Sequence, residues 1–370
     1  MDIRHPTPEE IVDLTSQISR AFSYNKDEPG VERDFPQLYS QSNINNLWIC
    51  SPGAGVAAHA GYYPAVLKVE GLPLPVAGIG GVFTNEAHQG KGLATSLVSK
   101  CCEEARNAGA ALAFLWSDKH EFYLKLGFHL VARQWTISFE PKHAPLLRAL
   151  GERAEIPERA LRVSEEVNGE LLRQSHEMLT QYPLGVERTP EEHAMYLDGG
   201  ACRVVSAWAG KQLAAYFVIG KGKDLQGYVH EWGGAEGALC HLMAQCLEDF
   251  QCPLSLLSPQ FMPEEVPWIY SLERAGIPAK AEYLALVKLL SLEKLQRLVR
   301  DYLQRIGLDP AEFSIAPEED HFRLSWRGKV LGPLDEAGLL RLLFGPQLPE
   351  EGEMRAFLPL RLWYWGMDSV

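Results

Sequence analysis

Residues 82-VFTNEAHQGKGLATSLVSKCC-102 join the end of an apolar, strand-like run to a helix-like segment through a glycine-rich loop. After the loop, Leu93, Leu97, Val98 and Cys101 recur at helical spacing, which predicts an amphipathic helix. Backbone N–H groups at a helix N-terminus bind anions, and small residues let a phosphate approach the main chain. The stretch therefore predicts a phosphate-binding turn.

Two common phosphate loops do not fit this spacing. A Walker A loop requires glycine where Asn85 stands, and Ser or Thr where Gly92 follows Lys91. A dinucleotide fingerprint requires glycine where Thr95 stands, and a parallel βαβ unit that the preceding strand-like runs do not provide. The remaining pattern is Gln-x-x-Gly-x-Ala, which begins at Gln89.

The segments around the loop indicate a mixed α/β unit. Apolar runs separated by turn residues predict an antiparallel meander before the loop, and a change of period marks the helix after it. In chain order, the expected elements are strands at 47–50, 55–69 and 74–84, a strand at 111–116, a short helix at 121–127 and a strand at 129–139.

Residues 78-GIGGVFTNEAHQGKGLATSLVSKCCEEARNAGAALAFLWSDKHEFYLKLGF-128 resemble the GNAT superfamily of acyl-CoA-dependent N-acetyltransferases. The match covers the strand, the loop, the helix, the next strand and the closing FYLKLGF segment. In that family the loop holds the coenzyme A pyrophosphate, and the preceding strand pairs with the pantetheine arm. The resemblance implies acetyl-CoA contacts at Val82, Phe83, Thr84, Gln89, Gly90, Lys91, Gly92, Leu93, Ala94 and Thr95.

The same resemblance implies a catalytic tyrosine. Tyr123 matches the family tyrosine that points at the thioester sulfur and protonates the leaving thiolate. A phenol, with an ordinary pKa of about 10, is a suitable donor to a thiolate. The alternative is an aromatic residue that only packs. No carboxylate occurs in the strand at 76–84, so that strand supplies no base.

A chain of 370 residues exceeds what one core usually fills. We expect an α/β (α+β) fold with tandem GNAT-like lobes, mixed and mostly antiparallel sheets, and a small C-terminal module. The expected domains are an acetyl-CoA-binding, catalytic GNAT domain at 1–148, a degenerate GNAT-like domain at 149–288, and a sterol-carrier-like α+β module at 289–370. The second domain is expected to have lost coenzyme binding, because its loop lacks Gln or Arg and Glu236 would repel a pyrophosphate.

This arrangement resembles the Eis-type (enhanced intracellular survival) acetyltransferases, in which the terminal carboxylate of the chain acts as the base. Here the chain ends 361-RLWYWGMDSV-370, which is aromatic-rich and close to neutral, as suits a tail that packs inside. The resemblance implies the Val370 carboxylate as base, directly or through water. A tail packed for stability alone is the alternative. Glu231 and Asp118 are candidates for contacts with a cationic acceptor, and a structural role is the alternative for each.

The composition narrows the partners. A net charge of −13 argues against nucleic acid, because nucleic-acid binders show a basic face. No cysteine pair has CxxC spacing, so no metal is expected. The N-terminus lacks a signal-peptide pattern, and no apolar run approaches the length of a membrane span, so we expect a cytoplasmic protein without a membrane partner.

The expected activity is transfer of an acetyl group from acetyl-CoA to a primary amine of a small cationic molecule, with aminoglycosides and polyamines as the Eis-type precedents. A protein lysine or N-terminal amine is an alternative acceptor. A catalytically silent acyl-CoA sensor or scaffold is the alternative from another functional class. The sequence is compatible with a homo-oligomer. It does not identify the acceptor amine.

Overall fold

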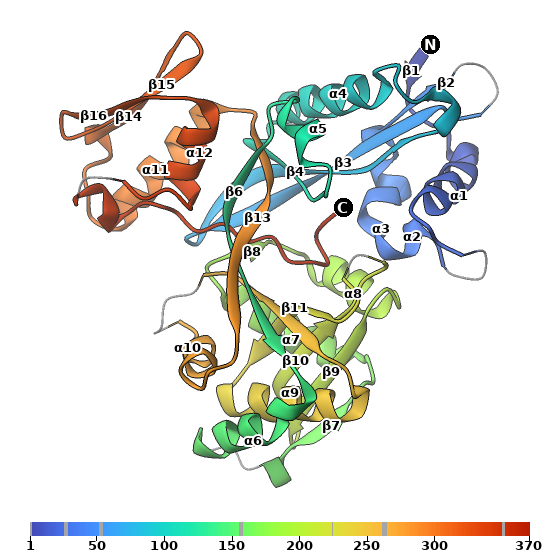
Figure 1. The fold of residues 1–370 in the computed structure, drawn as a ribbon, viewed down its shortest axis with the longest axis vertical. Helices are drawn as coiled ribbons and strands as arrows, with labels where there is room; N and C mark the ends of the chain where they lie inside the picture. Colours follow the sequence, from blue (N-terminus) through green and yellow to red (C-terminus); the bar gives the residue numbers. More distant parts are fainter. Residues whose placement is uncertain are drawn as a thin grey trace.

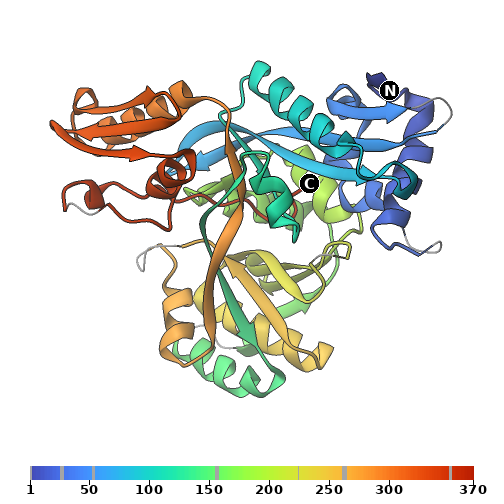
Figure 2. The same cartoon turned by 45° about the horizontal axis from the view of Figure 1, so that its top comes forward.

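The structure of the chain is a computed structural model, and it describes residues 2–25, 29–51, 55–154, 158–223, 225–260, 265–349 and 352–370. The molecule consists of two lobes and a smaller C-terminal module, which come together near its centre (Figure 1). The first lobe carries the N-terminus, and the second lies below it in this view. Both views place the C-terminus between the two lobes, beside α5 (Figure 2).

One sheet of thirteen strands runs through both lobes. Its order is β1-β2-β3-β4-β5-β13-β6-β12-β11-β10-β9-β7, and β8 pairs with β3 off this path. The β4–β5 and β11–β12 pairs are parallel, whereas the other pairs are antiparallel. The strands are β1 (Asp2–Arg4), β2 (Leu47–Ser51), β3 (Ala58–Val69), β4 (Leu72–Thr84), β5 (Leu112–Leu115), β6 (His129–Phe139), β7 (Arg162–Ser164), β8 (Gly185–Val186), β9 (Arg203–Ala209), β10 (Gln212–Ile219), β11 (Tyr228–Gly234), β12 (Leu254–Ser258) and β13 (Ala279–Leu289).

Strands β6 and β13 join the two lobes. Strand β13 lies between β5 and β6, although it follows them by more than a hundred residues in the chain. Strand β6 in turn pairs along Trp135–Phe139 with β12. The mixed, mostly antiparallel character expected from the sequence is confirmed, but a division at 148/149 does not separate two sheets.

The helices cover the faces of this sheet. Helix α4 buries Leu97, Val98, Cys101 and Ala105 against the first lobe, on the face that the 3.6-residue period predicts. The α-helices are α1 (Ile11–Ala21), α2 (Val31–Asp34), α3 (Pro36–Tyr39), α4 (Leu93–Asn107), α5 (His120–Leu124), α6 (Ala144–Arg153), α7 (Gly169–Gln181), α8 (Pro190–Asp198), α9 (Glu236–Phe250), α10 (Pro267–Arg274), α11 (Leu292–Arg305) and α12 (Glu336–Phe344). The 3-10 turns are η1 (Pro8–Glu10), η2 (Gln41–Asn46), η3 (Glu86–His88), η4 (Pro141–His143), η5 (Glu158–Ala160), η6 (Pro310–Glu312) and η7 (Met354–Ala356).

The C-terminal module has a separate antiparallel sheet, packed on α11 and α12. Its strands are β14 (Phe313–Glu318), β15 (His321–Trp326) and β16 (Lys329–Leu334). Beyond the module, the tail returns to the lobes and buries apolar side chains from Leu358 to Met367 (Figure 1).

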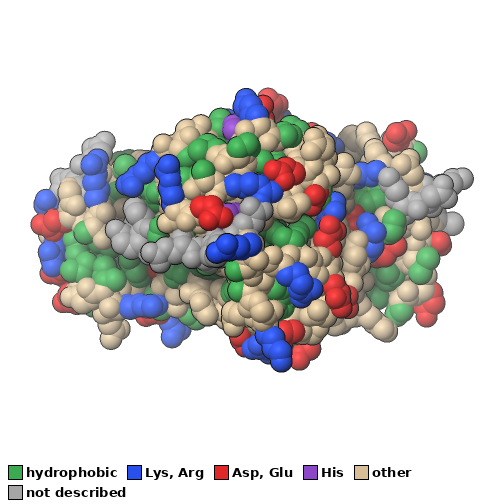
Figure 3. Space-filling view, turned by 90° about the horizontal axis from the view of Figure 1, so that it is seen from below, with side chains coloured by type: hydrophobic (Ala, Val, Ile, Leu, Met, Phe, Trp, Pro, Cys, Tyr) green, Lys and Arg blue, Asp and Glu red, His purple; other side chains and the backbone are tan. Residues whose placement is uncertain are grey.

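Three further features of the described residues concern surface charge, membrane-spanning helices and metal ligands. On the face seen in Figure 3, Lys and Arg side chains are interspersed with Asp and Glu side chains. None of the described helices is both long enough and apolar enough to cross a bilayer. Within the same described ranges, no three His, Cys, Asp or Glu side chains are grouped as metal ligands.

Candidate active site

The glycine-rich loop between β4 and α4 is open to solvent on the side of its two central glycines. Gly90 and Gly92 have φ of +73° and +74°, a conformation that only glycine adopts readily. A Cβ added at either position would meet no heavy atom within 4 Å. Gly92 is the N-cap residue of α4 and provides no side chain to cap its first-turn amides. The loop therefore leaves amide donors beside free space, which suits a pyrophosphate.

A cavity of about 380 Å³ lies against this loop and the end of β4. Of the ten predicted acetyl-CoA contacts, nine line it: Val82, Phe83, Thr84, Gln89, Gly90, Gly92, Leu93, Ala94 and Thr95. Lys91 is not among the lining residues, and its ammonium donates to the Ala87 carbonyl at 3.2 Å. Lys119, Phe122, Tyr123 and His88 complete the wall.

The end of β4 separates from β5 and so makes room for this cavity. The two strands pair only over Val76–Gly78 and Leu112–Phe114. Beyond this pairing, the β3–β4 register shifts where β4 carries Gly81, at φ +61°. A bulge of this kind redirects a strand. The carbonyl of Gly81 accepts a hydrogen bond from the buried His59 ring at 2.7 Å, which fixes the bulge.

A second cavity, of about 170 Å³, lies on the other side of Tyr123. We call it the acceptor cavity. Tyr123, Val82 and Lys119 line both cavities, so the two spaces meet at these residues. Asp118 lies on the wall of the acceptor cavity, and so does the last residue of the chain, Val370.

Tyr123 lies on the short helix α5 and is only 6% exposed. Its ring packs edge-to-face on Phe122 and Phe128. Burial raises the pKa of Tyr123 to about 12, although a hydrogen bond with Ser117 opposes that effect. The phenol is therefore neutral at physiological pH and able to donate a proton.

The terminal carboxyl group lies directly against β4. A Cβ placed on Gly80 would lie 2.9 Å from a carboxyl oxygen of Val370, and one on Gly78 would lie 2.7 Å from its Cγ2. These two glycines thus leave the space that the end of the chain fills. The sequence-based expectation that the tail packs inward agrees with this position; its role as a base remains a prediction.

Polar side chains from both lobes hold the last residues of the tail. The Lys221 ammonium donates to the carbonyls of Gly366, Met367 and Ser369 at 3.0, 3.2 and 2.6 Å. From α3, the Gln37 amide donates to the Met367, Asp368 and Ser369 carbonyls at 3.1, 3.3 and 3.0 Å. The backbone leading to the terminal carboxylate is therefore held on two sides.

A buried ion-pair network anchors the side chain of Asp368. Arg188 donates to both Asp368 oxygens at 2.7 and 2.8 Å and to Glu231 at 2.7 Å. Burial opposes the charge on Arg188, but Asp368 and Glu231 outweigh it and raise its pKa above the usual value. Glu231 is 0% exposed and lines neither the coenzyme cavity nor the acceptor cavity. The structure thus places this predicted substrate contact in the anchor of the tail.

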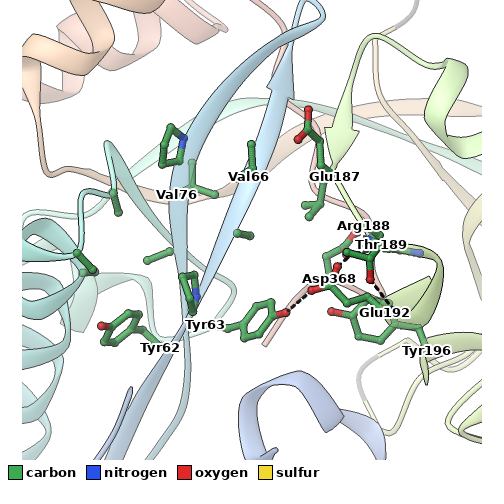
Figure 4. A pocket seen from close by; sticks show the side chains of 18 residues that line it. Tyr62, Tyr63, Val66, Val76, Glu187, Arg188, Thr189, Glu192, Tyr196 and Asp368 are labelled. Carbon is green, nitrogen blue, oxygen red and sulfur yellow. Dashed lines mark hydrogen bonds and ion pairs between the residues drawn. The ribbon is translucent and has the colours of Figure 1, made fainter. Parts of the chain in front are cut away.

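The anchored tail separates the acceptor cavity from a cleft between the lobes. This cleft, of about 470 Å³, is lined by Arg188 and Asp368 and by residues of β3, β4 and α8. Figure 4 shows Arg188 beside Asp368, and Tyr63 reaching from β3 toward Glu192, whose carboxylate it contacts at 3.0 Å. Asp368 therefore faces one space and Val370 the other.

Comparisons with known proteins agree with this geometry. Residues 2–131 match the acetyltransferase (GNAT) domain family. Similar solved structures include a GCN5-related N-acetyltransferase from Kribbella flavida, at 16% identity and a TM-score of 0.59, covering 89% of this chain and 83% of that one. Another is Eis1 from Mycobacterium abscessus, at 14% identity and a TM-score of 0.57, covering 90% and 84%. None of the curated proteins compared with the sequence matches it.

At such identities the solved structures show a shared fold, while the family match concerns the lobe that carries the loop and Tyr123. The expected tandem-GNAT fold is therefore confirmed. Residues 2–131 thus match the acetyltransferase (GNAT) domain family, and the overall fold is similar to that of Eis1.

Proposed function

We propose that the protein transfers an acetyl group from acetyl-CoA to a primary amine of a small cationic acceptor. One observation carries this proposal: Tyr123 lies where the coenzyme cavity meets a second cavity that contains the terminal carboxyl group. A thioester held from one side and an amine held from the other would meet between a proton donor and a proton acceptor.

The first lobe would hold acetyl-CoA, which supplies the activated acetyl group when bound. The amides at the start of α4 suit the pyrophosphate, and the free edge of β4 from Val82 to Thr84 suits the amides of the pantetheine arm. The open space beside Gly90 and Gly92 supports this assignment.

The Val370 carboxylate would take a proton from the acceptor amine, directly or through one water. The amine nitrogen then bonds to the acetyl carbon, and the carbon–sulfur bond breaks. Tyr123 would give its proton to the departing sulfur, so that coenzyme A leaves as the thiol. Proton transfer by one positioned side chain typically raises the rate of a reaction by about 10²- to 10⁴-fold. The Val370 carboxylate and Tyr123 would each supply one such proton transfer.

The acceptor would enter through the second cavity, where Asp118 is an exposed anion on the wall. Aminoglycosides, polyamines and small monoamines all carry the required primary amine, and all belong in the first screen. Glu231 is not part of this proposal, because its carboxylate is already paired with Arg188.

The proposal is tested by following thiol release from acetyl-CoA against a panel of amines. Tyr123→Phe should lower kcat by about 10²-fold or more while acetyl-CoA still binds, because only the proton donor is lost. Two extra residues after Val370 should abolish turnover without lowering the melting temperature. Binding of acetyl-CoA with no turnover on any amine would instead indicate a silent acyl-CoA sensor.

A further inference from the structure

A short turn of the second lobe reaches both the first lobe and the tail. It follows β10 and contains Gly220, Lys221 and Gly222, and both glycines have positive φ, at +74° and +52°. A Cβ on Gly222 would lie 2.5 Å from a carboxyl oxygen of Asp34, on α2. Glycine therefore allows the turn to lie directly on the first lobe. This contact places the Lys221 side chain, which is 3% exposed, beside the last residues of the tail.

The Lys221 ammonium group matches the acceptors around it. An ammonium group has three N–H donors and no acceptor. Three backbone carbonyls accept hydrogen bonds from it, those of Gly366, Met367 and Ser369. The ring of Phe35, which also lines the acceptor cavity, has its centre 4.4 Å from the nitrogen and likewise favours a cation. A neutral amine would have only two N–H groups for three carbonyl oxygens, so the site fits the charged form better.

The ionisable groups around Lys221 come from both lobes and from the tail. They are Asp34 on α2, Asp368 in the tail, Arg188 before α8, Cys202 before β9 and His230 on β11. Asp34 and Asp368 are each paired with an arginine. Burial lowers the pKa of His230 to about 4 and raises that of Cys202 to about 12, so neither changes its charge between about pH 6 and pH 9. Burial lowers the pKa of Lys221 to about 7, which lies inside this range.

The end of the chain depends on these hydrogen bonds for its position. Ser369, whose carbonyl oxygen lies 2.6 Å from the Lys221 nitrogen, directly precedes Val370. Val370 lies on the wall of the acceptor cavity, where a base would meet the acceptor amine. A misplacement of about 1 Å can lower the rate of a catalysed step about 10²-fold. Lys221 is not among the residues that line the coenzyme cavity or the acceptor cavity, so it acts on this step only through the tail.

We propose that Lys221 is a positioning residue for the terminal carboxylate: its ammonium group holds the last peptide groups of the tail and so sets where the base meets the acceptor amine. This inference rests on the proposed acetyl transfer and gives the second lobe a part in that reaction. No bond to Lys221 forms or breaks during the transfer, and its proton stays on Nζ. The neutral amine holds the tail less firmly, so the base loses its position when Lys221 loses its proton.

The first test replaces the ammonium group with an uncharged side chain of similar length. Lys221→Met should lower kcat at least about tenfold at about pH 6.5. Thiol release from acetyl-CoA is the assay, and the acceptor is whichever of spermidine, kanamycin and 2-phenylethylamine reacts fastest. KM for acetyl-CoA should change less than about twofold, because none of the described tail residues lines the coenzyme cavity.

A second lysine offers the matched control. The Lys68 ammonium also donates to three carbonyls, at distances of 3.5, 3.0 and 2.7 Å, but these belong to Leu179, Thr180 and Tyr182 of the second lobe. Lys68→Met should therefore leave kcat within about twofold of the wild type. A kcat in Lys221→Met equal to that of the wild type, or an equal loss in both variants, would overturn the inference.

The pH profile separates positioning of the base from packing alone. The ratio of kcat between the wild type and Lys221→Met cancels the ionisation of the amine and of Tyr123. This ratio should fall about fivefold from about pH 6 to about pH 9, with its midpoint near the Lys221 pKa of about 7, because a charge-assisted hydrogen bond becomes a neutral one.

Gln37→Met is the control for the pH profile. The Gln37 amide donates to the tail from the other side and does not titrate, so the corresponding ratio should be the same at every pH. A ratio for Lys221→Met that is equally constant would overturn the inference.

A measurement without turnover separates this inference from the proposed function. A carboxypeptidase removes Val370 only from a tail that has left its site, and a free peptide of residues 361–370 corrects for the pH dependence of the protease. Release should be at least about tenfold faster from Lys221→Met than from the wild type or Lys68→Met. Release from the wild type should also become faster as the pH rises, a measurement that needs no substitution and stands even if Lys221→Met does not fold.

The outcomes of this measurement are distinct. Equal release from all three proteins, together with a wild-type release that does not change with pH, would overturn the inference alone. Faster release from Lys221→Met with an unchanged kcat would show that Lys221 holds the tail without positioning the base, and would also overturn it. Slow release from the wild type with no thiol release for any amine would overturn the proposed acetyl transfer, and the positioning role with it.

Discussion

The two lobes contain the same strand–turn–helix element and use it in different ways. In the first lobe, residues 85–92 separate β4 from α4, and the glycines in this loop face open space. In the second lobe, Ala235 alone separates β11 from α9. There Gly234 has φ +129°, and a Cβ on it would lie 2.5 Å from Ala215 Cα.

The helices that follow the two turns also differ, because α9 is more deeply buried than α4. Helix α4 buries five of its fifteen residues, so it covers one face of the sheet and leaves its N-terminus free. Helix α9 buries ten of fifteen and carries Glu236 in its first turn, where a carboxylate already satisfies the helix dipole. A phosphate site thus needs loop length and unfilled space as well as a helix N-terminus. The second lobe instead supplies Arg188 and Lys221, which hold the tail that enters the first.

The largest effect is expected where the tail meets the first lobe. Gly80→Ala adds a methyl group where the Val370 carboxyl oxygen and Cβ would be 2.9 and 3.0 Å away. The displaced carboxylate should lower kcat by about 100-fold, the lower range for a lost base. Gly169→Ala, where a new Cβ meets nothing within 4 Å, is the control. Full activity in Gly80→Ala would contradict the assignment of the terminal carboxylate as base.

The second lobe's contribution is tested at its buried ion pair. Arg188→Leu leaves Glu231 and Asp368 buried without their cation, and should lower the free energy of unfolding by about 3–5 kcal/mol. The matched change at an exposed pair, Arg203→Leu opposite Glu165, should cost about 0–1 kcal/mol. Urea unfolding of both variants measures the difference. Similar losses in the two would mean that the network does not anchor the tail.

Paired substitutions, one in each turn, test whether the first turn alone takes part in coenzyme binding. Gly92→Val forces a branched residue to φ +74° beside the coenzyme cavity. This change should lower the free energy of unfolding by about 1–2 kcal/mol and raise KM for acetyl-CoA about tenfold or more. Ala235→Val, at an exposed position with φ −75°, should leave KM unchanged. A comparable KM increase in Ala235→Val would show that the second turn also takes part in coenzyme binding.

A pH dependence of stability, which builds up gradually over several pH units, is expected at Lys221. Burial lowers its pKa to about 7 in the folded protein, against 10.5 for the ordinary side chain. Between these values the unfolded chain binds the extra proton, so rising pH favours folding by at most about 1.4 kcal/mol per unit. The free energy of unfolding of the wild type relative to Lys221→Met should therefore rise from pH 7 to pH 10. A constant difference would place the folded pKa outside this window.

The features that the sequence reveals are those encoded locally. The helix from Leu93 and the turn at Gly90 and Gly92 follow from spacing within a few residues, and the FYLKLGF segment is part of the resemblance to the family. Nine of the ten coenzyme contacts that this resemblance implies line one cavity. Lys91 is the exception: its side chain is exposed and donates to the Ala87 carbonyl.

The features that the sequence does not reveal depend on distant pairings. Arg188 meets Asp368 across 180 positions, and Gln37 meets the tail across more than 300. Neither residue lies in a motif or a periodic pattern, so one sequence gives no signal for either. The aromatic wall of the acceptor cavity escapes sequence analysis for the same reason, because its members belong to segments that only tertiary packing brings together.

The position of β13 between β5 and β6 affects how the chain can be divided into fragments. A fragment that ended at residue 148 would lack the strand between β5 and β6, and would expose two strand edges that face each other. The first lobe can complete its sheet only after nearly four-fifths of the chain has been synthesised. A gene fusion that cut the chain between the lobes would therefore separate β5 and β6 from the strand that pairs with both of them.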